Sequence, residues 1–209
     1  MKKNTTEPSQ GIFQQRRSGV LLSVTALPGS SGLSLVEGFE PPNCGFFDSA
    51  CQFIDWLANG GFSLWQVLPL GPTHVDDSPY LCLSSLAGES HFIGLQWLQK
   101  SGLLEPQIEL SDISHRDALD RAHHQFKQVA TDHQWHQDYV LFCYQAQDWL
   151  DDFSLFMALH HQRSDQAWYE WPTPLRDRHS KAIGDAKQQL NDEIAQIKFV
   201  QFLFFKQWS

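Results

Sequence analysis

Apolar and polar positions divide the amino-terminal part of the chain into a strand, a helix and a second strand. Residues 19–25 are apolar and partly β-branched, and a loop rich in proline and glycine follows them. Apolar residues then recur at helical spacing up to Gly60 and Gly61, a pair typical of a helix C-terminus. The helical stripe consists of Phe47, Ala50, Cys51, Ile54, Leu57 and Ala58. A second apolar run covers residues 62–70. The pattern predicts a right-handed βαβ unit with parallel strands that helices cover on both faces.

From residue 107 onward the pattern is helical almost throughout. Glu105-Pro106 is typical of a linker into this region, and Asp112 or Ser114 is a candidate N-cap. The last apolar face runs to Trp208 with no glycine cap, charged tail or proline stop, so we expect the chain to end inside an element. The face consists of Leu190, Ile194, Ile197, Val200, Leu203 and Phe204. The expected divisions are a flexible segment 1–16, a βαβ part 17–100, a helical insertion 101–182 and a long helix 183–209.

Composition and charge narrow the class of protein. Hydrophobic residues make up 42% of the chain, and the formal net charge is -9 at pH 7. The acidic balance argues against nucleic acid or an anionic membrane as partner. No apolar run approaches the roughly 20 residues of a membrane span, and the amino terminus lacks the apolar core of a signal peptide. We therefore expect a cytoplasmic protein.

Cysteines and histidines offer no convincing metal site. The four cysteines, Cys44, Cys51, Cys82 and Cys143, match no zinc spacing and are expected to be reduced thiols that fill core positions. His133 and His136 share a helix face, but no further ligand completes a set. The histidines between 115 and 136 are therefore expected on a solvated helix surface, with no metal and no cofactor. Asp151, Asp152 and Glu170 are likewise expected to be surface charges rather than catalysts.

The polar turn after the second strand is the strongest candidate for chemistry, because barrel enzymes hold substrate where strands end. Tyr80 follows Ser78-Pro79 in this turn, whereas Trp56, Trp65 and Trp149 lie at positions typical of core. Taken alone, the residues leave two interpretations of the turn. Asp77 and Ser78 either bond the local backbone of a proline turn or contact a ligand.

Several runs of the chain resemble one known family. Residues 17–95 are similar to the amino-terminal part of the 4-alpha-glucanotransferases (amylomaltases, glycoside hydrolase family 77). The matching runs are 18–22, 25–29, 65–73, Asp77-Ser78-Pro79-Tyr80 and Ala87-Gly88, followed downstream by 149–153, 155–159, 170–172, 174–178, Phe199, Gln201, Phe202, Phe204, Phe205, Gln207 and Trp208. Together they cover most of the chain from Arg17 onward in family order.

The resemblance implies an α/β fold, namely the amino-terminal portion of a (β/α)8 TIM-type barrel with its first two strands and a large helical insertion. It implies α-1,4-glucans and maltooligosaccharides as partners, and it places Asp77, Ser78 and Tyr80 beside bound glucan. Retaining transfer needs two carboxyl groups, about 5 Å apart. In the family these come from later barrel strands, so no catalytic residue is expected in this chain, which has only two strand-like segments where a whole barrel takes about 250 residues.

The candidate loop also departs from the family pattern. Leu81 stands where relatives commonly have glutamine, and Glu89-Ser90 replaces the usual asparagine-proline. Residues 33–43 are longer than the tight run of many relatives. Three interpretations of the chain remain open, of which the last implies no function. The chain is the amino-terminal part of a glucan-transferring enzyme, a noncatalytic glucan-binding protein, or an inert fragment.

Overall fold

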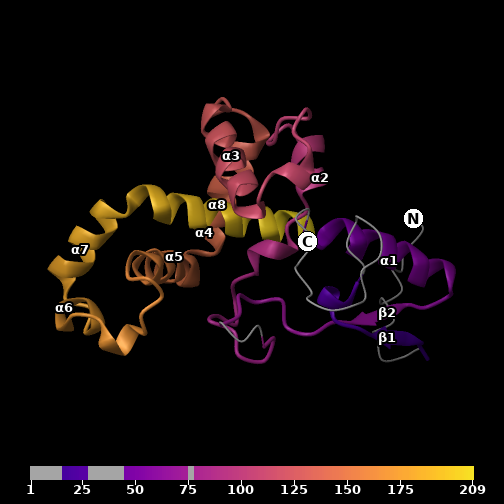
Figure 1. The fold of residues 1–209 in the computed structure, drawn as a ribbon, viewed down its shortest axis with the longest axis horizontal. Helices are drawn as coiled ribbons and strands as arrows, with labels where there is room; N and C mark the ends of the chain where they lie inside the picture. The colour runs from indigo at the N-terminus through magenta and orange to yellow at the C-terminus, as the bar shows by residue number, and fades with distance from the viewer. Residues whose placement is uncertain (1–15, 28–44, 75–77) are drawn as a thin grey trace, which may run out of the picture.

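The computed structural model describes residues 16–27, 45–74 and 78–209, which form an elongated, mostly helical molecule (Figure 1). Its regular elements are β1 (Gly19–Leu21), α1 (Phe47–Asn59), β2 (Leu64–Gln66), α2 (Leu95–Lys100), α3 (His115–Gln128), α4 (Gln134–Gln145), α5 (Gln147–Gln162), α6 (Thr173–Arg176), α7 (Ser180–Gln189) and α8 (Asn191–Trp208). Short 3₁₀ turns are η1 (Val24–Ala26), η2 (Ser90–Phe92), η3 (Leu110–Asp112) and η4 (Trp168–Glu170).

The strand-helix-strand unit is present as predicted. β1 and β2 pair in parallel with Gly19 opposite Leu64, and α1 connects them. Gly19 is required at this point, because a Cβ would lie 2.7 Å from the Cβ of Leu64. α1 carries Asp48 in its first turn and ends at Asn59, after which Gly61 adopts a φ of 77°. The glycine signal for the end of this helix is confirmed.

The expectation that helices cover both faces of the strands is wrong for the described residues. Side chains alternate between the faces of a strand, and Trp65 packs against Phe53 of α1 with ring centroids 5.0 Å apart. Leu21, by contrast, is 62% exposed, and Leu64 is also exposed. The described part of the chain contributes a helix to one face of the pair and leaves the other face open.

Two further core assignments also need correction. Trp56, expected in the core, is 60% exposed, because it lies on the outer flank of α1, where it stacks between Phe53 and Phe62. Cys51 is exposed on the same helix and does not fill a core position. Cys82 and Cys143 are free thiols of intermediate burial, whereas Cys44 lies outside the described residues.

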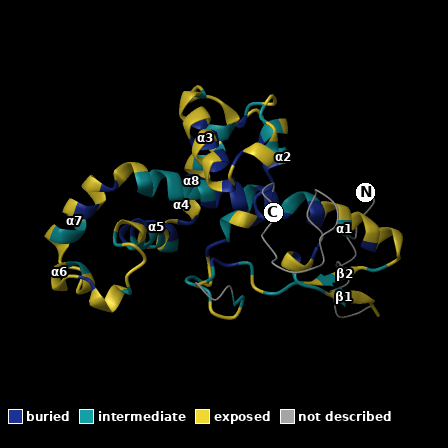
Figure 2. Ribbon diagram, viewed as in Figure 1, coloured by how far each residue is buried: buried dark blue, intermediate teal, exposed yellow. Residues whose placement is uncertain are grey.

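α8 is the central helix of the molecule. It packs against α3, α4, α5, α7 and η2, and the buried residues of its carboxyl-terminal half lie at the centre of the molecule (Figure 2). Residues 183–209 are not the single helix expected from the sequence. α7 ends at Gln189, Leu190 leaves helical geometry with a ψ of 19°, and α8 begins at Asn191. This break lets α7 and α8 both pack against α5.

Two buried glutamines of α8 fix the segment between β2 and α2. Gln201 is only 3% exposed, and its side-chain amide donates to the carbonyl of Gly88 at 2.9 Å and accepts from the Gly88 N–H at 2.8 Å. Gln207 forms the same pair with Gly94, at 3.3 and 3.0 Å. Trp208 adds a bond from its Nε1 to the carbonyl of Phe92 at 3.2 Å. The backbone from Gly88 to Gly94 is therefore held along α8.

Gly88 allows this close approach. A Cβ at Gly88 would lie 2.2 Å from the ring of Phe204, a distance that no side chain could occupy. The ring of Phe204, a residue of α8, is itself buried in the hydrophobic core. The peptide of residue 88 can reach Gln201 only because it has no side chain.

α3 buries two histidines, which corrects the expectation of a solvated histidine surface. Ser114 caps this helix as predicted, and the buried face consists of His115, Ala118, Leu119, Ala122, His123 and Phe126. His115 donates from Nε2 to the carbonyl of Ile93 at 2.9 Å and stacks on His91 with ring centroids 5.2 Å apart. Burial lowers the pKa of His115 to about 4, although the bond to Ile93 opposes that shift. Its imidazole is therefore neutral at pH 7.

None of the described helices is both long and apolar enough to serve as a membrane span.

Replacing Gln201 with methionine is expected to destabilise the protein by about 3 kcal/mol. Methionine keeps the length of the side chain but leaves a buried N–H and a buried carbonyl of Gly88 without partners, at a cost of about 1–3 kcal/mol each. Urea unfolding followed by circular dichroism measures the change. Gln189→Met, at the exposed end of α7, is the matched control and should be neutral. Equal unfolding midpoints for the two variants would contradict the role of the amide pair.

Acidification from pH 7 to pH 5 is expected to remove about 2 kcal/mol of stability through His115. Its folded pKa is about 4, below the roughly 6.5 of an exposed histidine, so the unfolded chain binds more protons between these values. The contribution is complete above pH 6.5 and is lost as the pH falls toward 4. In urea titrations at several pH values, His115→Gln should flatten this slope, and His124→Gln, on the exposed side of α3, should not. A slope unchanged in His115→Gln would refute the assignment.

Candidate functional site

The loop that follows β2 is closed at its neck by backbone hydrogen bonds. The N–H of Leu83 donates to the carbonyl of Pro72 at 2.7 Å, and Thr73 and Cys82 form an antiparallel bridge. Closer to β2, the N–H of Glu89 donates to the carbonyl of Leu70 at 2.8 Å. The chain therefore leaves β2, forms the loop and returns to the same place.

The tip of the loop is a turn around Pro79. The N–H of Leu81 donates to the carbonyl of Ser78 at 3.0 Å, and the thiol of Cys82 donates to the carbonyl of Pro79 at 3.2 Å. This turn presents Tyr80, which is 72% exposed, and leaves Leu81 exposed beside it. Ser78 is partly buried next to them, whereas Asp77 lies outside the described residues. Of the three predicted site residues, the structure therefore brings Ser78 and Tyr80 together on one turn.

A second polar turn returns the loop to α8. The hydroxyl of Ser84 accepts from the N–H groups of Leu86 and Ala87, both at 3.1 Å. Gly88, which follows directly, is the residue held by Gln201. The loop thus rests on β2 at one end and on a buried contact with α8 at the other, which limits the conformations available to its exposed tip.

A groove of about 390 Å³ lies beside the loop, between α3, α5 and α8. Its polar lining includes Glu89, His91, His115, Arg116, Asp120, His161, Glu193 and Gln196. Two carboxylate–imidazole pairs lie in it, Glu89 with His91 at 2.9 Å and Glu193 with His161 at 3.0 Å. Nothing in the sequence pattern indicated these pairs, because each joins a loop or helix position to a partner without periodic spacing.

The electrostatics of Glu89 decide what this groove can do. Burial raises the pKa of its carboxyl, but hydrogen bonds from the side chain and backbone of His91 and from the hydroxyl of Ser90 outweigh burial, so the pKa is lowered overall. An ionised carboxylate accepts hydrogen bonds from hydroxyl groups but cannot protonate a leaving group. Glu89 is therefore suited to bind a polar ligand and unsuited to act as a general acid.

Other acidic residues have structural partners. Asp151 pairs with Lys198, and Asp152 pairs with Arg178 at 2.6 Å. These ion pairs are exposed and lie on α5, away from the ends of the strands, as expected for surface charges. Across the described ranges, no three potential metal ligands come together. His133 instead caps α4, and His136 donates to the carbonyl of Val129 at 2.9 Å.

Comparison with known proteins gives a consistent result. Residues 38–209 match the family model described as 4-alpha-glucanotransferase. The 4-alpha-glucanotransferase of Thermus thermophilus is 36% identical, in an alignment that covers 93% of this chain and 39% of that protein. The enzyme of the same name from Synechocystis is 32% identical, in an alignment that covers 95% of this chain and 40% of that protein.

A solved structure shows the same fold. The amylomaltase from Streptococcus agalactiae in complex with acarbose superposes with a TM-score of 0.77 at 27% identity, over 93% of this chain and 40% of that chain. The predicted fold class, an amino-terminal part of a TIM-type barrel with a helical region, is therefore confirmed. The chain spans about 40% of the length of these relatives. With the family model matched over most of its residues, this chain belongs to the 4-alpha-glucanotransferase family, glycoside hydrolase family 77.

Proposed function

We propose that this chain supplies a glucan-binding loop to the transfer of α-1,4-glucan segments. The observation that carries the proposal is the exposed ring of Tyr80, presented on a turn whose loop is anchored at both ends, in a chain of this family. An aromatic ring offers a large apolar face at a small cost in conformational entropy, and one face of a pyranose ring is apolar. Tyr80 would stack against a glucose unit.

The polar residues of the turn would complete this contact. Ser78 lies directly before Pro79 on the same turn, and Asp77 precedes it in the sequence. Hydroxyl and carboxylate oxygens accept hydrogen bonds from sugar hydroxyls. We assign Asp77, Ser78 and Tyr80 to substrate binding, with Tyr80 as the stacking platform.

We assign binding and orientation, rather than bond cleavage, to these residues. Retaining transfer needs one carboxylate as nucleophile and one protonated carboxyl as acid, about 5 Å apart. Near the loop Glu89 is kept ionised by His91, and Asp151 and Asp152 are held in ion pairs on α5. The two catalytic carboxyl groups would come from other strands of the barrel. A noncatalytic glucan-binding role is the second candidate, and the same observations favour it.

The proposed setting is the cytoplasm, where α-1,4-glucans and maltooligosaccharides would be the partners. The formal charge of -9 supports a partner other than nucleic acid or an anionic membrane. Leu81, exposed beside Tyr80, adds apolar surface but no hydrogen-bonding group. We therefore expect recognition at the tip to depend more on stacking than on hydrogen bonds.

Replacing Tyr80 with alanine is expected to weaken the binding of maltoheptaose about tenfold, because the stacking surface is lost. Isothermal titration calorimetry of the full chain measures the dissociation constant. Tyr144→Ala is the matched control, since Tyr144 is similarly exposed on α4, far from the loop in sequence, and its loss should leave affinity unchanged. Equal affinities of Tyr80→Ala and the wild type would rule out stacking at this position.

The chain by itself is expected to show no disproportionation of maltotriose. Glu89, which lies at the neck of the loop, has a pKa lowered by its hydrogen bonds to His91 and Ser90, so it is unsuited to the acid step. Glucose release from maltotriose by the purified chain is the measurement, with a full-length family enzyme as positive control. Clear turnover by the purified chain would overturn the assignment of binding without catalysis.

A further inference from the structure

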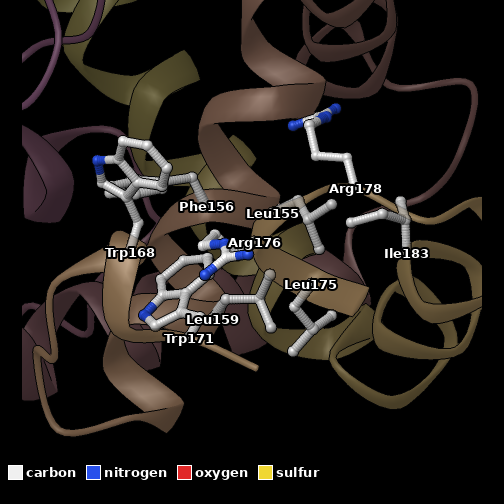
Figure 3. Close-up of a pocket in the computed structure, with 9 residues that line it drawn as sticks. All are labelled: Leu155, Phe156, Leu159, Trp168, Trp171, Leu175, Arg176, Arg178 and Ile183. Atoms are coloured by element: carbon white, nitrogen blue, oxygen red, sulfur yellow. The ribbon is translucent and has the colours of Figure 1, made fainter. Parts of the chain in front are cut away.

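A second pocket lies on the other side of α5 from the groove. The groove is lined by Phe153, Met157 and His161 of this helix, whereas the second pocket is lined by Leu155, Phe156 and Leu159. η4, α6 and α7 close the second pocket, which has a volume of about 300 Å³ (Figure 3). None of the loop residues around Tyr80 contributes to it. It is thus a separate site within the helical insertion.

The floor of this pocket is apolar and fixed. The indole of Trp171 is buried and stacks on Phe156 with ring centroids 5.6 Å apart and planes at 30°. Its N–H donates to the carbonyl of Gln166 at 2.9 Å. Because that donor is already used, the floor offers apolar contact and no strong hydrogen bond to a ligand.

The rim provides an exposed aromatic face opposite polar groups. Trp168 is 55% exposed and stands at one side of the pocket, with Arg176 near the middle and Arg178 at the other side (Figure 3). Arg176 donates two hydrogen bonds to Asp177, at 2.8 and 3.2 Å. Arg178 donates one to Asp152 at 2.6 Å. Each guanidinium has further N–H donors, and each carboxylate has further acceptor sites.

The end of α6 fixes the position of Arg178. Its φ of 56° lies in the left-handed region, which non-glycine residues seldom adopt. This conformation belongs to the cap at the end of α6: the N–H of Arg178 donates to the carbonyl of Leu175 at 3.1 Å, and the N–H of His179 donates to the carbonyl of Pro174 at 2.8 Å. Here the ion pair with Asp152 ties this residue of the α6–α7 turn to α5. The guanidinium is therefore held at the rim.

Charge balance decides which ligand fits. The guanidinium groups of Arg176 and Arg178 line the pocket, whereas the carboxylates paired with them, Asp177 and Asp152, do not. Each guanidinium is neutralised by its partner, so the pocket carries no net charge that would favour an anion. The guanidinium N–H groups that the carboxylates leave unused are hydrogen-bond donors, which suit the oxygen atoms of sugar hydroxyls. The apolar floor and the ring of Trp168 suit the apolar faces of a sugar. A volume of about 300 Å³ is at the small end of ligand sites and is suited to one or two sugar rings.

We propose that this pocket is a second carbohydrate-binding site that takes one or two glucose units of an α-1,4-glucan. Trp168 stacks on a pyranose face, and the guanidinium groups of Arg176 and Arg178 donate hydrogen bonds to its hydroxyl oxygens. The inference rests on the proposed function only for the choice of an α-1,4-glucan among carbohydrates. The site uses none of the residues assigned to the loop.

Hydrogen–deuterium exchange of the full chain with and without millimolar maltotriose tests the proposal. Maltotriose should slow exchange in residues 168–178 of the wild type. Trp168→Ala should abolish that protection and weaken the binding measured there about tenfold, equivalent to ~1.4 kcal/mol. Trp168→Phe, which keeps an aromatic face, should restore most of it. Tyr169→Ala is the matched control, because Tyr169 is an exposed neighbour that does not line the pocket, and it should retain protection.

The outcomes separate this site from the loop. Unchanged exchange in residues 168–178 of the wild type would overturn the pocket, even if Trp168→Ala failed to fold. Protection that persists in Trp168→Ala, or is lost equally in Tyr169→Ala, would overturn it as well. In Tyr80→Ala, protection of 168–178 should remain. Protection of residues 168–178 without protection of residues 78–83 would support binding at the pocket and refute binding at the loop. Protection of residues 78–83 alone would refute binding at the pocket and leave the loop proposal standing.

Discussion

Two buried amide–peptide pairs hold the rest of this structure in place. Gln201 and Gln207 of α8 each satisfy both the N–H and the carbonyl of one glycine, and both pairs join residues 113 apart in sequence. A buried peptide group without a partner costs far more than a satisfied one contributes, so these contacts specify which segment lies along α8. The absence of a side chain at Gly88 is what lets Phe204 and Gln201 reach the backbone.

The position of this contact explains how an exposed loop can act as a defined surface. The loop after β2 ends at Ala87-Gly88, where the backbone enters the contact with Gln201. Its other end is fixed by the bond between Glu89 and Leu70 beside the parallel strands. Binding residues on loops work when a rigid scaffold positions the loop, and α8 is that scaffold here. Tyr80 can therefore remain exposed without the tip losing its shape.

The helical insertion contributes surfaces of its own. α5 separates a polar groove with two carboxylate–imidazole pairs from an aromatic pocket lined by two arginines. The break at Leu190 separates the helices that line the two sites, because α7 contributes Ile183 to the pocket and α8 lines the groove. The bend thus has a structural role that helical periodicity does not reveal.

Local sequence determined the elements that depend on neighbouring residues. The sequence alone predicted the βαβ unit, the Ser114 cap, the glycines after α1 and the family motifs. It could do so because propensity, capping and short motifs act over a few positions. Tertiary structure alone decided that Leu21 and Trp56 are exposed, that His115 and His123 are buried, and that the last helix breaks at Leu190. The partners of Gln201 and Gln207 belong to the same group, although a polar residue on an apolar helix face was a visible signal. Burial and pairing of this kind depend on segments distant in sequence, and periodicity within one segment carries no information about what another segment places against it.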